Sequence, residues 1–175
     1  MGGVFTASKW GGITSALTMW ARQRPLREQV FKSSIRNLMN ISSGLRPGLS
    51  GHTEIVVGTR DTAPHVGSGK IKVLATPVMV SLMEEAALNA VEGLLPPGHQ
   101  TVGTRLDITH VAATPVGLHV TARAELTHID GRRLTFRVWA DDERDRIGEG
   151  THERIIVNVE RFDKRSQEKA PRRAP

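Results

Sequence analysis

The chain has 175 residues, no cysteine and a formal net charge of +6. That length is sufficient for one domain with its own core. The absence of cysteine excludes disulfide bonds, a thiolate nucleophile and a Cys-ligated metal. No apolar run approaches the roughly 20 residues that span a bilayer, so we expect no membrane partner.

The charge is distributed unevenly along the chain. Residues 1–50 carry +6 and residues 164–175 carry +4, whereas residues 51–163 carry −4. Since a phosphate backbone requires a basic face, the acidic middle argues against a domain that binds nucleic acid. Any such binding is expected only through the basic ends, and the middle is the expected folded domain.

The two ends differ in composition from the middle. Residues 1–50 are rich in Ser, Thr, Gly and Arg and nearly free of acid, which is typical of a mitochondrial transit peptide. The alternative is a disordered extension without a targeting role, in a cytoplasmic protein. Residues 164–175 are charged and contain proline, and they predict a disordered basic tail.

The middle begins with a predicted strand at residues 53–59 and a short extended segment at residues 70–75. A helix is predicted at residues 77–95. The Thr76 hydroxyl can cap this helix, and Pro77 suits the first helical position. Pro96, Pro97 and Gly98 end it.

Four predicted strands follow, at residues 101–113, 118–129, 132–141 and 146–159. The second alternates apolar and polar residues, and Asp130-Gly131 is a strong hairpin turn. A strand, a long helix and an antiparallel meander predict an α+β hot-dog fold, in which a curved antiparallel sheet wraps around one central helix. The uncovered sheet edge favours a homodimer.

Glu84 is the first candidate for chemistry. It shares a helix face with Val80 and Leu88, whereas Glu85 falls on the polar stripe. A carboxylate on a buried face is costly unless it has a partner or a function. The simpler interpretation is a boundary glutamate that reaches water or pairs with an arginine such as Arg105.

His110 lies in the predicted strand 101–113, where strict alternation places it on the same face as Val102 and Thr104. A single histidine on such a face is more often a core residue, and Thr76 is more often a simple N-cap. The histidines lack metal-ligand spacing, so we expect no metal. His152-Glu153 is interpreted as a surface pair.

The combination is more specific than its members. With Thr76-Pro77 at the helix start, Glu84 in the helix, Gly103 in the next strand and His110 after it, the chain resembles the fluoroacetyl-CoA thioesterase-like family of hot-dog thioesterases. The resemblance covers residues 51–163.

This resemblance implies an acyl-CoA thioesterase that hydrolyses a small acyl-CoA thioester as a homodimer, without a cofactor other than the CoA of its substrate. It implies that Thr76, Glu84 and His110 are catalytic. It further implies that Gly103 lies against the substrate and that Arg154 assists substrate or CoA binding.

One departure concerns the segment before Thr76. The fluoroacetate-specialised member of the family has aromatic residues there, whereas residues 65–70 of this chain contain no Phe and include Gly67 and Gly69. Two glycines make a flexible loop. We therefore expect thioesterase chemistry without fluoroacetyl selectivity.

The individual roles stay open at this stage. A thiolate leaves readily, because a thiol has a pKa of about 8.5, so the enzyme chiefly needs a nucleophile and a stabilised oxyanion. Glu84 or Thr76 can be the nucleophile, and Glu84 or His110 the base. Two other functions are also open: a hot-dog dehydratase or hydratase on acyl thioesters, and a non-catalytic binding or assembly module.

Overall fold

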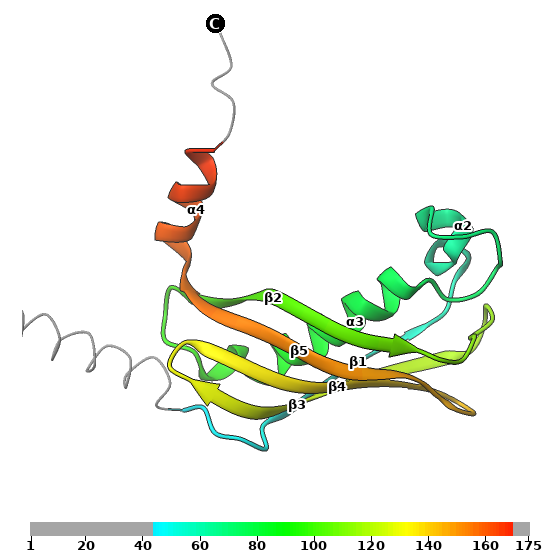
Figure 1. Cartoon of the computed structure of the whole chain (residues 1–175), viewed down its shortest axis with the longest axis horizontal. Helices are drawn as coiled ribbons and strands as arrows, with labels where there is room; N and C mark the ends of the chain where they lie inside the picture. The colour runs from blue at the N-terminus through cyan, green and yellow to red at the C-terminus, as the bar shows by residue number, and fades with distance from the viewer. Residues whose placement is uncertain (1–43, 170–175) are drawn as a thin grey trace, which may run out of the picture. The chain divides into compact units, whose positions relative to one another are not determined.

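An antiparallel sheet of five strands forms the body of the protein in a computed structural model that describes residues 44–169 (Figure 1). The strands lie in the order β1-β3-β4-β5-β2, so β1 and β2 are the two edges. Their bounds are β1 Ser50–Val56, β2 His99–His110, β3 His119–Asp130, β4 Arg133–Asp142 and β5 Arg146–Asn158. The helical elements are η1 Thr59–Asp61, α2 Ala63–Val66, α3 Thr76–Asn89, η2 Glu92–Leu94 and α4 Val159–Gln167.

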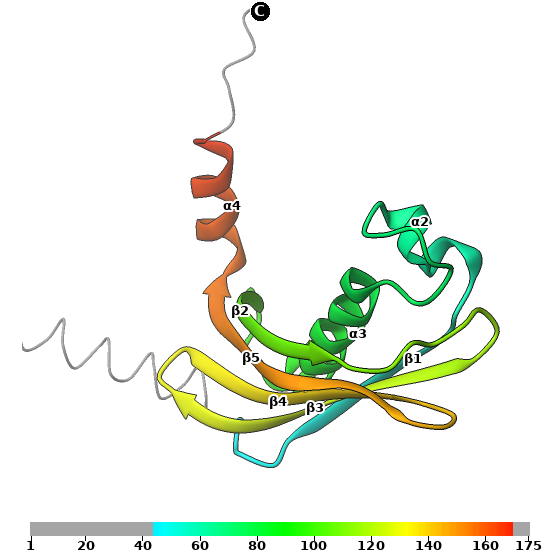
Figure 2. The same cartoon turned by 45° about the vertical axis from the view of Figure 1, so that its right-hand side comes forward.

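The sheet curves around helix α3, and the predicted α+β hot-dog fold is confirmed (Figures 1 and 2). Alternation in β3 and β4 turns one side of each strand toward the helix, and those side chains are fully buried. Gly51 of β1 allows the close approach, because a Cβ there would lie 2.3 Å from the Ala86 carbonyl oxygen of α3. The core consists mainly of Met79, Leu82, Met83, Ala86, Ala87, Ala122, Ala124, Leu126, Leu134, Phe136, Val138 and Ala140.

The predicted hairpin turn is present between β3 and β4. Gly131 has φ 57°, a left-handed conformation that glycine adopts without strain. The predicted helix is shorter than expected, because α3 ends at Asn89 and a separate turn, η2, follows it. Within residues 44–169, no helix has the length and apolar character needed to cross a membrane.

The ends of the expected domain also differ from prediction. Leu45 is only 9% exposed and belongs to the core, so the packed chain begins before residue 51. At the other end, α4 continues to Gln167, so residues 164–167 of the predicted disordered tail are helical. The side chain of Asn158 caps α4 by accepting from the Arg161 backbone N–H. Most of the predicted transit peptide lies outside the described residues.

Candidate active site

Helix α3 begins beside the end of strand β2, and this brings Thr76 and His110 together. Thr76 Oγ1 and His110 Nδ1 share a hydrogen bond of 2.9 Å. The N-cap of α3 is Ala75, without a side-chain cap, so the predicted capping role of Thr76 is wrong. The Thr76 hydroxyl forms its hydrogen bond with His110 instead.

The His110 ring is placed to stay neutral. Burial lowers the pKa of His110 from its usual value, because the charged form loses its hydration. Its Nε2 is buried and has no hydrogen-bond partner among the described residues. A neutral imidazole that contacts a hydroxyl is a competent base near neutral pH.

A bulge in β2 decides which residues face the helix. The pairing of β2 with β5 shifts between Gly103 and Arg105, and such a shift reverses the alternation of side chains. Thr104 is therefore exposed, and the predicted strict alternation that joined it to His110 is wrong. Gly103 turns toward α3 instead.

Glu84 lies directly over this glycine. A Cβ at position 103 would be 2.6 Å from Glu84 Oε1, so only glycine leaves room for the carboxylate in this position. The Glu84 side chain is 41% exposed in the single chain and is thus half-buried. The pairing with Arg105, considered from the sequence, is absent among the described residues, because Arg105 contacts Asp107 and Glu153.

His152 belongs to this group, although the sequence interpretation placed it on the surface. It is 0% exposed. Its Nδ1 lies 2.9 Å from the Arg105 carbonyl oxygen, and its Nε2 lies 3.9 Å from Glu84 Oε1. Alternation in β5 contains the missed signal, because His152 and Arg154 fall on the same face of the strand as the buried Ile156.

Burial lowers the pKa of His152, and the neighbouring positive charge of Arg154 lowers it further. Because a carbonyl oxygen only accepts hydrogen bonds, we assign the proton of the neutral ring to Nδ1. Nε2 then carries the lone pair that faces Arg154 and Glu84.

Arg154 is 6% exposed and joins three elements. Its Nε and Nη2 donate to the hydroxyl and the carbonyl oxygen of Thr101 in β2, both at 2.9 Å. Its Nη1 donates to His152 Nε2 at 3.1 Å and to the Glu84 backbone oxygen of α3 at 3.4 Å. Burial lowers the pKa of this guanidinium.

The predicted site residues therefore form two groups within one chain. One is the Thr76–His110 pair, and the other joins Glu84 to Gly103, with Arg154 beneath. Thr76 and Glu84 lie about 12 Å apart along the helix axis at about 1.5 Å per residue. No hydrogen bond or ion pair links the two groups in residues 44–169.

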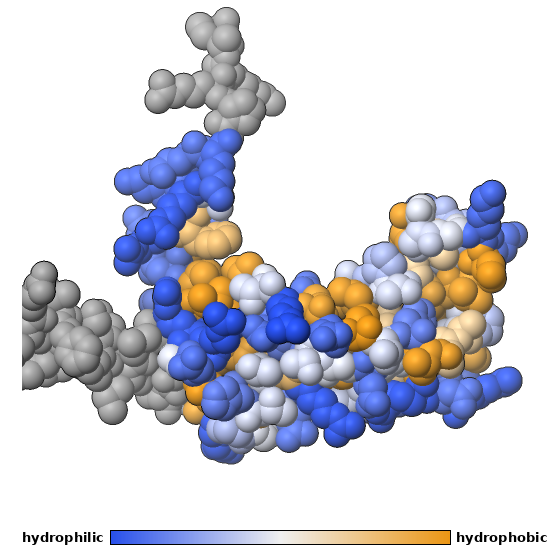
Figure 3. Space-filling view, in the orientation of Figure 1, coloured by the Kyte–Doolittle hydropathy of each residue, from blue (hydrophilic) through white to orange (hydrophobic). Residues whose placement is uncertain are grey.

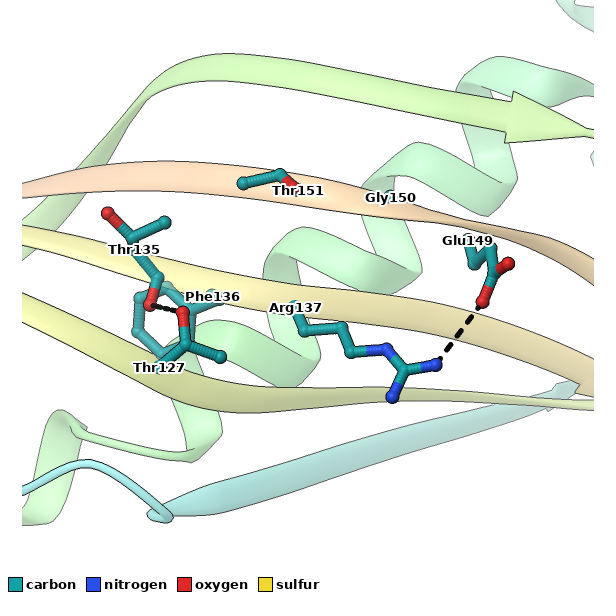
Figure 4. Close-up of a pocket in the computed structure, with 7 residues that line it drawn as sticks. All are labelled: Thr127, Thr135, Phe136, Arg137, Glu149, Gly150 and Thr151. Atoms are coloured by element: carbon teal, nitrogen blue, oxygen red, sulfur yellow. Dashed lines mark hydrogen bonds and ion pairs between the residues drawn. The ribbon is translucent and has the colours of Figure 1, made fainter.

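A hollow on the opposite side of the sheet contains none of these residues. Thr135, Arg137, Glu149 and Thr151 line it, and α3 lies behind the strands (Figure 4). Within the described chain, no three His, Asp or Glu side chains are grouped as metal ligands.

Comparison with known proteins identifies relatives of one kind. Residues 57–160 match the family described as fluoroacetyl-CoA-specific thioesterase. The fluoroacetyl-CoA thioesterase of Streptantibioticus cattleyicolor is 48% identical over 100 residues, which cover 57% of this chain and 72% of that enzyme. A solved structure of the fluoroacetyl-CoA thioesterase FlK is 41% identical with a TM-score of 0.70, and the match covers 73% of this chain and 99% of that one. A hot-dog-like protein from Thermanaerovibrio acidaminovorans shares the fold at 23% identity and a TM-score of 0.69, over 77% of this chain and 100% of that one.

The fold and these matches define a hot-dog thioesterase, an enzyme that hydrolyses acyl-CoA thioesters. The chain belongs to the fluoroacetyl-CoA-specific thioesterase family, as the residue quartet predicted. The predicted family, enzyme class and activity are confirmed, and they take precedence over the dehydratase and the non-catalytic alternatives.

Proposed function

We propose that the protein hydrolyses a small acyl-CoA to the free acid and CoA, with Thr76, Glu84 and His110 as catalytic residues and without a resident cofactor. The observation that carries the assignment of these residues is the 2.9 Å hydrogen bond between the Thr76 hydroxyl and His110. Through this bond the neutral His110 imidazole can accept the proton of the Thr76 hydroxyl. The bond also holds that hydroxyl in place at the start of α3.

In the first half of the reaction, His110 takes the Thr76 proton while Thr76 Oγ1 bonds to the thioester carbon. The carbon–sulfur bond breaks, and His110 returns the proton to the departing sulfur. In the second half, Glu84 takes a proton from water as the water oxygen attacks the Thr76 ester. Glu84 then gives this proton to Thr76 as the acid leaves.

Gly103 and Arg154 contribute in different ways in this proposal. Gly103 leaves room beside Glu84 Oε1 where an acyl group and its attacking water can lie. Arg154 donates to protein acceptors on α3, β2 and β5. It therefore supports substrate binding indirectly, by holding α3 and β5 against β2 and so placing Glu84.

The active form is a homodimer in this proposal, because the two groups of catalytic residues lie about two helical turns apart in one chain. β2 is an edge strand, with backbone groups unpaired on one side. Antiparallel pairing of two β2 strands brings the Thr76–His110 end of one copy to the Glu84–Gly103 end of the other. Hydrophobic surface is visible on this side of the molecule, between α2 and α4 (Figure 3).

The substrate in this proposal is a small acyl-CoA without selection for fluorine. Residues 65–70, just before the catalytic threonine, contain no Phe. Gly67 has φ 77°, and the loop after it exposes Ile71 by 74%. A loop without aromatic side chains lacks the rigid apolar surface needed to distinguish a fluorinated acyl group from an unfluorinated one.

The proposed location is the mitochondrion. The support is the acid-poor, Arg-containing composition of residues 1–50, all of which precede the family match that begins at residue 57. A fluorescent protein fused behind residues 1–50 tests this location. Import into mitochondria is the expected result, and a diffuse cytoplasmic signal would contradict it.

Mixing two inactive variants tests the shared site. Thr76→Ala and Glu84→Gln are each expected to abolish the steady-state release of thiol from short acyl-CoA substrates. If each site takes Thr76 from one subunit and Glu84 from the other, mixed dimers regain one intact site, and the mixture recovers about a quarter of the parent activity. Mixed dimers without any activity would show that each chain contains its own complete site.

A further inference from the structure

A fully buried histidine lies beneath the catalytic carboxylate without a role in the steps above. We propose that His152 is a positioning residue that holds the Arg154 guanidinium away from the Glu84 carboxylate, so that this carboxylate remains free to act. The inference rests on the proposed catalytic function of Glu84.

The surroundings of the His152 ring define its state. β2 presents the Arg105 carbonyl oxygen at 2.9 Å from Nδ1, and β4 presents the uncharged ring of Phe136 at 6.4 Å between centroids. The charged groups that face the ring are Arg154 of β5 and Glu84 of α3. With its proton on Nδ1, the ring offers one lone pair, at Nε2, and Arg154 donates to it.

The hydrogen bond from Arg154 to His152 matters because Arg154 lies close to Glu84. Its Nη1 lies 3.4 Å from the Glu84 backbone oxygen, so the guanidinium is close to the residue whose carboxylate should act. Among the described residues, however, no ion pair joins Arg154 to the Glu84 side chain, and Glu84 Oε1 lies 3.9 Å from Nε2 of the neutral His152 ring. A direct bond to arginine lowers the pKa of a carboxylate and makes it a weaker base.

Loss of the His152 lone pair would leave a buried Arg154 N–H without an acceptor, which is costly. The Glu84 carboxylate lies 3.9 Å from the same His152 nitrogen, so we expect it to become the new acceptor. His152→Leu should therefore allow an Arg154–Glu84 ion pair. His152→Gln is the matched control, because its amide N–H can donate to the Arg105 oxygen while its amide oxygen accepts from Arg154.

The experiment measures kcat against pH for the full-length enzyme, with the acyl-CoA that the parent hydrolyses best, because Glu84 acts after the thiol has left. For His152→Leu we expect a loss of about tenfold or more near neutral pH, with the acid limb moved by about one unit to lower pH. His152→Gln should keep the parent limb and most of the activity. Adding Arg154→Met to His152→Leu should move the limb back toward higher pH.

A purely structural role predicts a different result, in which His152→Leu and His152→Gln lose activity equally and the acid limb stays in place. That result would overturn the inference, and so would full activity in His152→Leu. If His152→Leu does not fold, as judged by circular dichroism, His152→Met takes its place in the same comparison.

A second readout does not depend on catalysis. Nitrogen-15 NMR of the histidine rings should show the His152 ring neutral at pH 7, with its single proton on Nδ1. A proton on Nε2 would overturn the inference. Absence of thioesterase activity in the parent would contradict the proposed function instead, so the two failures are distinguishable.

Discussion

The two faces of strand β5 contain similar kinds of side chain with very different consequences. On the outward face, Glu149 pairs with Arg137 at 3.4 Å, and both side chains are more than half exposed. On the inward face, His152 and Arg154 lie 3.1 Å apart and are almost inaccessible to solvent. Alternation along one strand separates the two groups.

The comparison of the two faces shows that the functional site is distinguished by the burial of its charged and polar side chains. The number of charged side chains does not distinguish it. An exposed ion pair in water contributes about 0–1 kcal/mol, because solvent screens it. A buried cation or imidazole must find partners, and these partners fix its position and shift its pKa. The outward pairs therefore add little to stability, whereas the inward pair is fixed in position next to Glu84.

The largest expected effect is at the carboxylate itself. Glu84→Gln should lower kcat by about 10²–10⁴-fold, because it removes a general base while keeping the shape of the side chain. The melting temperature should change little. Thiol release by Glu85→Gln provides the control, since the adjacent Glu85 is exposed. Equal activity in the Glu84→Gln and Glu85→Gln variants would contradict the proposed catalytic role of Glu84.

Gly103→Ala should produce the next largest effect. The new methyl group would meet Glu84 Oε1 at 2.6 Å, and the flexible glutamate side chain would move aside. A displacement of about 1 Å can cost about 10²-fold in kcat without unfolding the protein. Gly93→Ala is the matched control, because nothing lies within 4 Å of its added Cβ. A fully active Gly103→Ala would show that Glu84 acts from another position.

The buried histidines predict a moderate dependence of stability on pH. The pKa values of His110 and His152 are lowered in the folded protein, so below the ordinary value of 6.5 the unfolded chain binds protons that the folded chain does not. Stability should therefore be retained above about pH 6.5 and decline as the pH falls toward the folded pKa values. Thermal melting between pH 5 and 8 measures this decline. His152→Gln should reduce its slope, and an unchanged slope would contradict the prediction.

The smallest effect is expected on the outward face. Arg137→Ala should change the free energy of unfolding by less than about 1 kcal/mol, and kcat/KM should stay at the parent value. The loss includes the contact of the guanidinium with the Trp139 ring, 5.5 Å away. Urea denaturation measures the first quantity and thiol release the second. A large loss of activity would place a function on this face.

Much of the architecture could be predicted from residue order alone. The hairpin turn at Asp130-Gly131 and the alternation on both sides of it specify β3 and β4, because each strand has one apolar face that must be covered. The spacing of Thr76, Glu84, Gly103 and His110 identified the family. These signals lie in the residue order, so they can be recognised without knowledge of the tertiary structure.

Two features of the site were not predictable in this way, and a third, the burial of His152, was missed although the alternation in β5 indicates it. The bulge after Gly103 reverses the faces of β2, and its presence depends on pairing with β5. The Thr76 hydroxyl bonds to His110 instead of capping α3, because the fold brings the end of β2 to the helix start. His152 is buried because the inward face of β5 packs beneath Glu84.

The sequence by itself determined the order of elements, the strands of the central hairpin and the kinds of chemical group available, since these follow from side-chain periodicity and residue identity. Only the tertiary structure decided which polar groups meet, because contacts between α3, β2 and β5 join positions far apart in the chain. Hydrogen bonds act over about 3 Å, so the choice of partners depends on a register that no local pattern specifies.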